Sequence, residues 1–395
     1  HSLIFEAILE LYSQAKPIDV VTLTSQLKKK KKLQQVGGSA YLSELVAEVP
    51  TAAHVKEYAG LVKEAATRRS MISFATVLQD QAKTEDKDIE QILDEIEGKI
   101  FSLSQDNTQR DFESAAVLLE QHFEKTEEYS KNPGALRGLP TGMKSLDEIL
   151  GGLHDSDLIV LAARPAVGKS SFAFDIGRHV AVNHGKSVAI FALEMPGVQI
   201  IERLLSQQIN VPLWDLRMGK MTDAAYARFA EGAGKLADSK LFVDDTPGLN
   251  VMQLRSKARK LKIEQGLDFL IIDYLQLMQG VNVKSDNRVG EISEISRSLK
   301  LLARELNIPI MALSQLNRAV ESRTDHIPQL SDLRDSGSIE QDADLVIFLS
   351  REKLFNPETE RPDSADVIIA KHRNGPVGRV ELRFEEKTTK FKDLG

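Results

Sequence analysis

Cysteine, long apolar runs and an excess of basic residues are all missing from this sequence. None of its 395 residues is cysteine, which excludes disulfides, thiolate zinc sites and cysteine nucleophiles and suits a reducing compartment. No apolar run approaches the roughly 20 residues that cross a bilayer, and no segment resembles a signal peptide. A basic excess is also missing: the net charge is −7, so any contact with a nucleic acid must be local. We therefore expect a cytoplasmic protein with no membrane partner.

The remaining composition is that of an ordinary globular protein, with 42% hydrophobic and 28% charged residues in a chain long enough for two or three domains. Apolar spacing of three and four predicts a small all-α N-terminal domain over residues 1–103. Because the chain starts at His1, without methionine and inside a helical pattern, we expect that domain to be truncated at its start. For residues 104–137 we expect a linker that contains an amphipathic helix. This helix packs either on its own chain or on a neighbouring subunit. From 138 to 395, strands and helices alternate to the end.

Three local patterns add detail to these domains. The run Lys28–Lys32 fits a nucleic-acid patch or a solvated helix end, and a solvated end is the commoner identity for such a run. Ser145 and Glu148 form the capping-box pattern of a short helix that stops at Gly151. Apolar residues recur at helical spacing from Val289 to Leu306, which predicts a helix with one buried face.

The strongest signal is an apolar strand that runs into a glycine-containing loop and then into a helix, in LIVLAARPAVGKSS, residues 158–171. Such a loop turns successive backbone N–H groups toward the start of a helix, where the dipole also favours anions. Lys169 would reach the β- and γ-phosphates, and the Ser170 hydroxyl would bind the Mg²⁺ that bridges them. Ala163 replaces a usual glycine, so the loop must start in a conformation that alanine tolerates. The predicted ATP contacts in this loop are Ala166, Gly168, Lys169, Ser170 and Ser171.

Polar side chains end three further apolar strands. Asp273 ends FLIID, where it would hold the metal through water, although an isolated aspartate often only caps the next helix. Glu194 follows the strand over 187–193 and is a candidate general base, although alone it fits a solvated turn. Gln315 ends IPIMALSQ and is able to sense a γ-phosphate by hydrogen bonding. Together with the loop, these strand ends predict an α/β RecA-like P-loop ATPase domain, doubly wound on a mostly parallel sheet.

Further motifs accompany these strand ends. ARPAVGKSS, FALEMP, IIDYLQLM, ALSQLNR, SDLRDSGSIEQDADL and KHRNGPVG follow one another in the second part, and PIDVVTL, VGGSAYLSEL and PTAAHVKEYA occur in the helical part. In order and spacing, the chain resembles the DnaB family of bacterial replicative DNA helicases over almost its whole length. The resemblance implies a homohexameric ring that uses ATP and Mg²⁺ to travel 5′ to 3′ along single-stranded DNA and unwinds the duplex at a replication fork. It also implies primase and a helicase loader as partners, and work at the nucleoid.

The resemblance adds residues that no spacing argument supplies. In such rings ATP binds between adjacent subunits, and Lys371 and Arg373 of KHRNGPVG match the cations that act on the neighbour's transferred phosphoryl group. Arg203, nine residues after Glu194, matches a nucleotide-contacting position. Without the resemblance, the simpler interpretation is that Lys371 and Arg373 are polar residues at a strand end and that Arg203 is a surface arginine on a helix.

The best candidate for a DNA contact is Ser331–Gly337, which we predict to be a short, polar, flexible loop. Arg334, beside Asp335, can take a phosphate, and backbone N–H groups near Gly337 can approach a strand closely. The loop has no aromatic residue, which favours tracking of the DNA backbone over base stacking. Without the resemblance, a plain connection with a solvated salt pair is the simpler interpretation.

Two other functions share part of this pattern. A recombinase that forms an open filament on DNA has the same ATP residues, but the helical N-terminal domain and DLRDSGSIEQDADL argue against it. An ATP-gated scaffold without catalysis would need no general base, so Glu194, Asp273 and Gln315 together oppose it.

Overall fold

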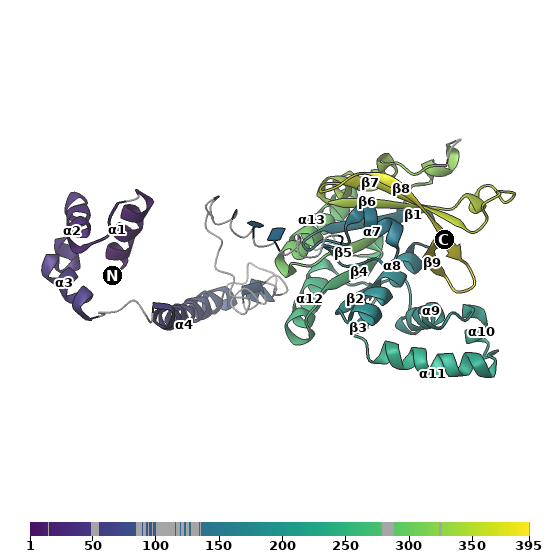
Figure 1. Cartoon of the computed structure of the whole chain (residues 1–395), viewed down its shortest axis with the longest axis horizontal. Helices are drawn as coiled ribbons and strands as arrows, with labels where there is room; N and C mark the ends of the chain where they lie inside the picture. The colour runs from purple at the N-terminus through teal and green to yellow at the C-terminus, as the bar shows by residue number, and fades with distance from the viewer. Residues whose placement is uncertain are drawn as a thin grey trace. The chain divides into compact units, whose positions relative to one another are not determined.

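The computed structural model divides the chain into two compact units, His1–Asp88 and Ile89–Gly395 (Figure 1). The residues it does not describe are 15, 49–54, 84–88, most of 90–135, 279–287, 324–325 and 395, together with the side chains of 55–56, 288 and 334–338. The predicted linker over 104–137 lies largely outside the described residues, so its limits and its amphipathic helix stay predictions.

The first unit is helical, as the apolar spacing predicts. Its helices are α1 (Ser2–Ser13), α2 (Val20–Lys29), α3 (Gly38–Glu48) and α4 (Val55–Lys83). Asp19 starts α2 by accepting a 2.7 Å hydrogen bond from the Thr22 backbone N–H. The small core of the unit contains Ile4, Ala7, Leu11, Leu23, Leu27, Val36 and Leu42. Throughout the described residues, helices lack the combination of length and apolar character that a membrane crossing requires.

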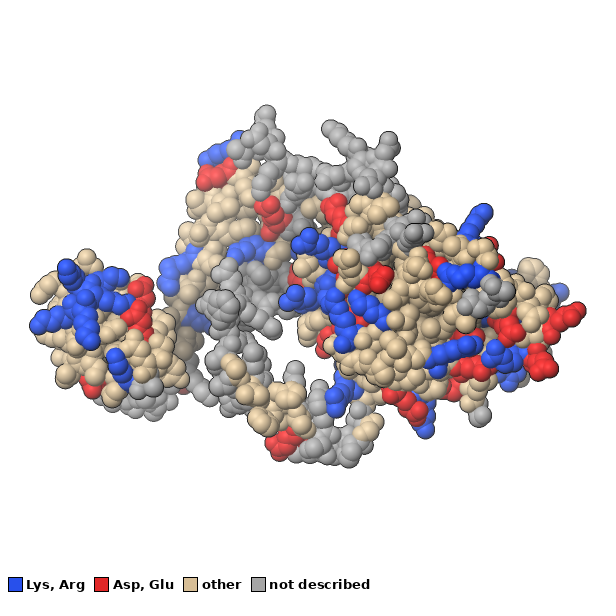
Figure 2. Space-filling model, turned by 90° about the horizontal axis from the view of Figure 1, so that it is seen from above, with Lys and Arg blue, Asp and Glu red and all other residues tan. Residues whose placement is uncertain are grey.

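The five lysines Lys28–Lys32 lie at the C-terminal end of α2 and just beyond it. Lys30 forms an ion pair with Glu10, and the Lys32 Nζ lies 3.9 Å from a Glu6 carboxylate oxygen. Cations at a helix C-terminus also interact favourably with its dipole. These contacts are those of a solvated helix end. Figure 2 shows that Lys and Arg side chains gather on this unit.

In its described residues, the second unit is built on a sheet of nine strands in the order β3-β2-β4-β5-β1-β6-β7-β8-β9. Its strands are β1 (Leu158–Ala163), β2 (Val188–Ala192), β3 (Leu241–Asp244), β4 (Phe269–Asp273), β5 (Ile310–Gln315), β6 (Leu345–Ser350), β7 (Ser364–His372), β8 (Gly378–Glu385) and β9 (Lys390–Asp393). The first six strands in this order pair in parallel. Every residue of β1 is buried, as a strand between two parallel neighbours with helices on both faces requires.

Two hydrophobic cores cover the two faces of the sheet. Helix α8 (Lys169–Arg178) packs Phe172 and Ile176 on one face, and α12 (Val251–Gln265) and α13 (Arg288–Leu306) pack on the other. The predicted helical stripe is confirmed by the burial of Ile292, Ile295, Leu299, Leu302 and Leu306, whereas Val289 is exposed. Further helices near the sheet are α7 (Lys144–Leu150), α9 (Gly197–Ile209), α10 (Leu213–Arg217), α11 (Asp223–Ala237) and α14 (Gly337–Asp342).

The predictions for the end of the sheet and for the start of α7 are wrong. Strands and helices do not alternate to the end, because β7, β8 and β9 form an antiparallel meander joined without helices. The capping box at Ser145 is also absent: α7 starts at Lys144 and its first N–H groups are held by Asp393, at 2.7 Å from Lys144 N and 3.0 Å from Ser145 N. A carboxylate from the far end of the chain accepts these bonds and replaces the local cap. The helix does stop at Gly151, which has a φ of 67°.

The segment before α7 packs closely against the segment that follows it. A Cβ added at Gly138 would lie 2.4 Å from the backbone oxygen of Leu153, next to the bridge between Leu139 and Leu153. Gly138→Ala should therefore lower the free energy of unfolding of this unit by about 2–4 kcal/mol, measured by urea denaturation.

The matched control is Gly234→Ala, because an added Cβ in helix α11 meets nothing within 4 Å. It should be neutral or stabilise by up to about 1 kcal/mol. An equal effect of the two substitutions would contradict the packing argument.

Candidate nucleotide-binding site

The phosphate loop connects the carboxyl end of β1 to the start of α8. Ala163 is the last residue of β1 and pairs with Gln315 of β5 and Leu349 of β6, so it keeps a strand conformation that alanine adopts without strain. The left-handed backbone falls instead at Ala166, with a φ of 65°, and at Gly168, with a φ of 110°. The loop thus starts in the conformation that the alanine requires and turns later.

A cavity of about 370 Å³ opens above this loop. This volume is within the range of small-molecule sites. Its lining residues are Ala163, Arg164, Pro165, Ala166, Gly168, Lys169, Ser170, Ser171, Glu194, Met195, Arg203, Tyr274, Gln315, Phe384 and Thr389. Of the predicted side chains, Lys169, Glu194 and Gln315 therefore line one cavity at the carboxyl edge of the sheet, where α/β folds bind their ligands. Asp273 lies next to this cavity, 4.0 Å from the Lys169 Nζ.

Lys169 is the buried cation of the cavity. Its Nζ lies 4.0 Å from Asp273 Oδ1 and 4.5 Å from the centroid of the Tyr274 ring, and its side chain is only 13% exposed. Burial lowers the pKa of Lys169, against the opposing charges of Asp273 and Glu194. A cation withdrawn from water in this way has a strong attraction for an incoming phosphate.

The surroundings of the Asp273 carboxylate indicate whether this site suits a metal ion. Its Oδ1 is buried and has no hydrogen-bond partner, and its side chain is 2% exposed. Burial raises the pKa of Asp273, while Lys169 and a hydrogen bond with Ser170 lower it. A buried carboxylate with one oxygen unsatisfied, in contact with a serine hydroxyl, is the oxygen donor set that Mg²⁺ prefers. These residues fit the ion.

Glu194 and Gln315 lie on the cavity wall. Glu194 follows β2 and is exposed, so it is free to meet water. Gln315 ends β5, and its backbone is fixed by Gln276, whose Nε2 donates to Ser314 Oγ at 2.8 Å and to the Gln315 carbonyl oxygen at 3.3 Å. Gln276 therefore holds the strand end while the Gln315 side chain stays exposed.

Arg203 extends from α9 into the same cavity. Its Nη1 donates to Ser171 Oγ at 3.3 Å, and its Nε is buried without a partner. Burial lowers the pKa of Arg203, and Arg217 acts in the same direction. A half-buried guanidinium whose Nε has no partner, next to the phosphate loop, is suited to an anion.

Lys371 and Arg373 do not belong to this cavity. Lys371 and His372 end β7, which runs antiparallel to β6, so they pair with Val346 and Leu345 at the amino end of β6. Leu345 in turn pairs with Ile159 of β1, four residues before the phosphate loop begins, or roughly 13 Å along the strand. These two cations therefore lie toward the edge of the sheet opposite the chain's own cavity.

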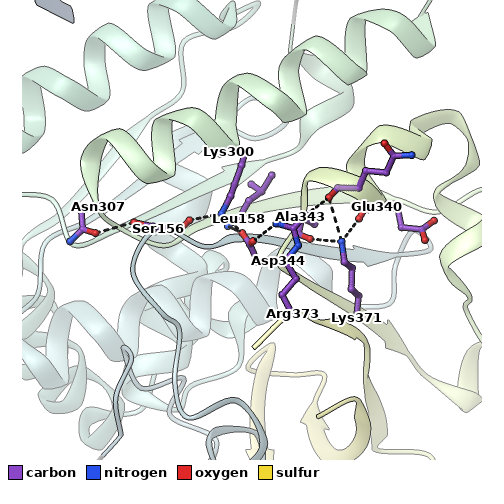
Figure 3. A network of polar contacts seen from close by, with 10 residues as sticks. Ser156, Leu158, Lys300, Asn307, Glu340, Ala343, Asp344, Lys371 and Arg373 are labelled. Atoms are coloured by element: carbon purple, nitrogen blue, oxygen red, sulfur yellow. Dashed lines mark hydrogen bonds and ion pairs between the residues drawn. The ribbon is translucent and has the colours of Figure 1, made fainter. Parts of the chain in front are cut away.

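Both cations are held by α14 and the residue pair that follows it (Figure 3). The Lys371 Nζ donates to the carbonyl oxygens of Glu340 at 2.6 Å and Ala343 at 2.7 Å, with Gln341 at 3.5 Å. Burial lowers the pKa of Lys371, and neighbouring Arg373 acts in the same direction. The three N–H donors of its ammonium group are thus directed at the C-terminal carbonyls of a helix, which otherwise lack partners.

The segment predicted to be a flexible DNA-contacting loop is folded into turns. Leu330–Ser336 is a 3₁₀ helix that runs into α14 at Gly337, so the loop prediction is wrong for the backbone. The physical reason is that Leu333 is buried in the core, and that Asp332 accepts a 2.7 Å bond from Gln329 N and pairs with Arg323. The backbone at Arg334, Asp335 and Gly337 is described, but their side chains are not.

Sequence reasoning missed several residues of the cavity. Tyr274 lies inside the IIDYLQLM motif, so its position next to Asp273 was a usable signal. Arg164 lies inside the phosphate loop and donates to the Leu316 carbonyl oxygen at 2.7 Å. Phe384 and Thr389 come from the C-terminal meander. The sequence of the phosphate loop does not indicate that this distant segment contacts it.

The fold and the cavity define a RecA-like P-loop ATPase. Residues 138–393 match the family model described as the DnaB-like helicase C terminal domain, and residues 1–64 match that of the DnaB-like helicase N terminal domain. The chain therefore belongs to the DnaB-like helicases, and it is an ATP-dependent replicative helicase.

Full-length relatives and solved structures agree with this assignment. The chain is 43% identical to the replicative DNA helicase DnaB of Geobacillus stearothermophilus and to the replicative DNA helicase DnaC of Bacillus subtilis, each over 100% of this chain and 87% of the relative. A DnaB-like replicative helicase, solved in a study of its interactions with primase, has 31% identity and a TM-score of 0.71 over 100% of this chain and 92% of its own. A second solved structure, described as an ATPase domain, has 35% identity and a TM-score of 0.69, and covers 72% of this chain and 100% of its own.

The loop geometry yields a prediction at Gly168. A Cβ there would lie 3.2 Å from the Phe391 ring, and the φ of 110° disfavours any L side chain. Gly168→Ala should lower the free energy of unfolding by about 1–3 kcal/mol and weaken nucleotide binding, because the loop must shift away from its cradle geometry.

Gly185→Ala is the control, since Gly185 also has a positive φ, of 62°, but nothing lies within 4 Å of its added Cβ. It should lose stability without losing nucleotide affinity, measured by calorimetric titration with a nucleotide. Retained affinity in Gly168→Ala would contradict the proposed cradle.

Proposed function

We propose that this chain works as a homohexameric ring in which ATP binds between adjacent copies, and that the ring travels 5′ to 3′ along single-stranded DNA at a replication fork while the other strand is excluded. One observation supports this most directly. The cations Lys371 and Arg373 lie toward the edge of the sheet opposite the chain's own phosphate loop, so they suit a neighbour's nucleotide and not their own.

The phosphates of ATP would be held by the backbone N–H groups from Ala166 to Lys169 and by the N-terminal end of α8. Lys169 would bind the β- and γ-phosphates as a desolvated point charge. Ser170 and Asp273 would hold Mg²⁺, Asp273 through water, and the ion would supply positive charge that neutralises the phosphates. This assignment is supported by the unsatisfied Asp273 Oδ1.

Hydrolysis needs a base and a group that responds to the γ-phosphate. Glu194, exposed to water on the cavity wall, would orient and deprotonate the attacking water. Gln315 would bind the γ-phosphate through its amide and transmit its loss through the end of β5, which Gln276 holds. Arg203 and Ser171 would complete the phosphate contacts from α9 and α8.

From the neighbouring copy, Lys371 and Arg373 would stabilise the charge that develops on the transferred phosphoryl group. DNA would be held by the segment that contains Arg334, Asp335 and Gly337, mainly through its phosphates. Because this segment runs directly into α14, whose end Lys371 and Arg373 contact, nucleotide and DNA sites share one structural element.

Partners follow from the family. A 31% identical relative is described with its interactions with primase, and we propose primase and a helicase loader as partners of the helical unit and the outer ring surface. We also propose that the ring acts on the nucleoid, in the cytoplasm.

The central test is strand displacement on a 5′-tailed fork with ATP and Mg²⁺. The parent chain should unwind the fork, whereas Glu194→Gln and Arg373→Ala should bind DNA, assemble and unwind at least about 1,000-fold more slowly. Arg379→Ala is the matched control, because Arg379 is 47% exposed and paired with a buried aspartate, as Arg373 is at 48%.

Retained unwinding by Arg379→Ala alone would support the proposal. A parent chain that hydrolyses ATP and coats DNA without displacing a strand would instead favour a filament-forming recombinase. The test should be made on rings whose assembly is verified by native mass spectrometry.

A second prediction concerns the metal. Asp273→Asn should weaken ATP binding about 10- to 100-fold in Mg²⁺ and have little effect in EDTA, because only the metal-dependent part of the affinity uses this carboxylate. Asp268→Asn, just before the start of the same strand β4, should bind ATP normally under both conditions. Equal losses with and without Mg²⁺ in Asp273→Asn would contradict a metal role.

A further inference from the structure

Asp344 lies between α14 and β6 and makes contacts in several directions. It is 5% exposed, and its Oδ2 accepts hydrogen bonds from Leu158 N at 2.8 Å and from the Lys300 Nζ at 2.5 Å. Its Oδ1 accepts from Arg373 Nη1 at 3.1 Å. The backbone adds two more bonds, from Asp344 N to the Leu158 oxygen and from Arg373 N to the Asp344 oxygen, both 2.9 Å. Asp344 thus joins the start of β1 to the end of β7.

The carboxylate is fixed independently of Arg373. The Lys300 Nζ, which approaches it from α13, also donates to the Ser156 backbone oxygen at 2.8 Å, and Ser156 Oγ donates to Asn307 at 2.9 Å (Figure 3). A buried carboxylate with several charge-assisted bonds has little freedom to move. Arg373 is therefore attached to a fixed point.

The guanidinium itself is only partly used by these contacts. Arg373 Nη1 binds Asp344 and Nη2 donates to the Gln341 carbonyl oxygen at 2.7 Å, while the side chain remains 48% exposed. Within the described part of the chain these are two bonds for a group with five N–H donors, which leaves three donors for a ligand. Lys371 differs, because its three donors face the carbonyls of Glu340 and Gln341 in α14 and of Ala343 just after it. Arg373 is consequently the cation that is presented without any rearrangement of α14.

We propose that Asp344 is the positioning residue for Arg373, the cation that each copy lends to, that is, places in, the nucleotide site of its neighbour. The inference rests on the proposed action of Arg373 in the adjacent nucleotide site. A planar guanidinium held by a carboxylate is oriented as well as attracted, so its free edge has a defined direction. Because Asp344 is bonded to Leu158, the first residue of the strand that ends in the phosphate loop, the chain's own site and the cation it lends move as one body.

The test is the substitution Asp344→Asn, which keeps the shape and removes the charge. ATP hydrolysis by assembled rings should fall about 10- to 100-fold in kcat, with KM within about threefold, because a misdirected catalytic group loses rate more than substrate binding. Asp344→Glu, which keeps a negative charge near Lys300 for folding but displaces the oxygens, should show the same split.

Asp366→Asn is the matched control. Asp366 is 10% exposed in its side chain and pairs with the 47% exposed Arg379, against 7% and 48% for Asp344 and Arg373. The control breaks an ion pair of the same kind, in the same antiparallel part of the sheet, without touching the lent cation. An equal loss of kcat in Asp366→Asn would overturn the proposal, because the effect would then be a general loss of structure.

Mixed rings separate the inference from the proposed function. Lys169→Ala subunits cannot use their own site but supply an intact Arg373, so mixing them with Asp344→Asn subunits should restore hydrolysis above the sum of the two parents, as it should with Arg373→Ala subunits. Rescue of both mixtures supports the proposal. Rescue of Arg373→Ala alone overturns the role of Asp344 and leaves the shared site standing. Rescue of neither overturns the action of Arg373 on its neighbour, and the role of Asp344 with it.

Discussion

The structure depends on strand β1, which is buried along its whole length between β5 and β6 and covered by a hydrophobic core on each face. Its backbone pairing holds six of its residues in register with β5 and five with β6. The carboxyl end of this strand opens into the phosphate loop, and its first residue binds Asp344. One rigid element therefore sets the positions of both the phosphate loop and Arg373.

Charged groups are buried at both ends of this strand, and the free energy lost by removing them from water is offset differently at each end. In the cavity, Lys169 and Asp273 remain 4.0 Å apart and Asp273 Oδ1 is unsatisfied, an arrangement that a phosphate and a metal ion would complete. Near the amino end, Asp344 is satisfied by Lys300, Leu158 and Arg373. The first arrangement suits a ligand that comes and goes, and the second suits a fixed support.

Local signals predicted well wherever the chain organises itself over a few residues. The strand, loop and helix around Lys169 and the stripe from Ile292 to Leu306 lie where periodicity and the glycine position indicate. Predictions failed where a distant segment competes with a local one. The start of α7 is held by Asp393 in place of the Ser145 cap, and the segment before α14 is folded into turns because Leu333 is buried. Short-range patterns contain no information about such partners.

The class of protein could be predicted from the sequence, because a phosphate cradle is built from consecutive residues whose backbone conformation is a local property. The sequence also supplied the strand-end carboxylates, since parallel strands bring their carboxyl ends to one edge. By contrast, it took the folded chain to show that Phe384 and Thr389 line the cavity and that Arg373 lies away from it, bound to Asp344. Those relations depend on antiparallel pairing and on long-range hydrogen bonds, whose partners are chosen by packing and not by spacing along the chain.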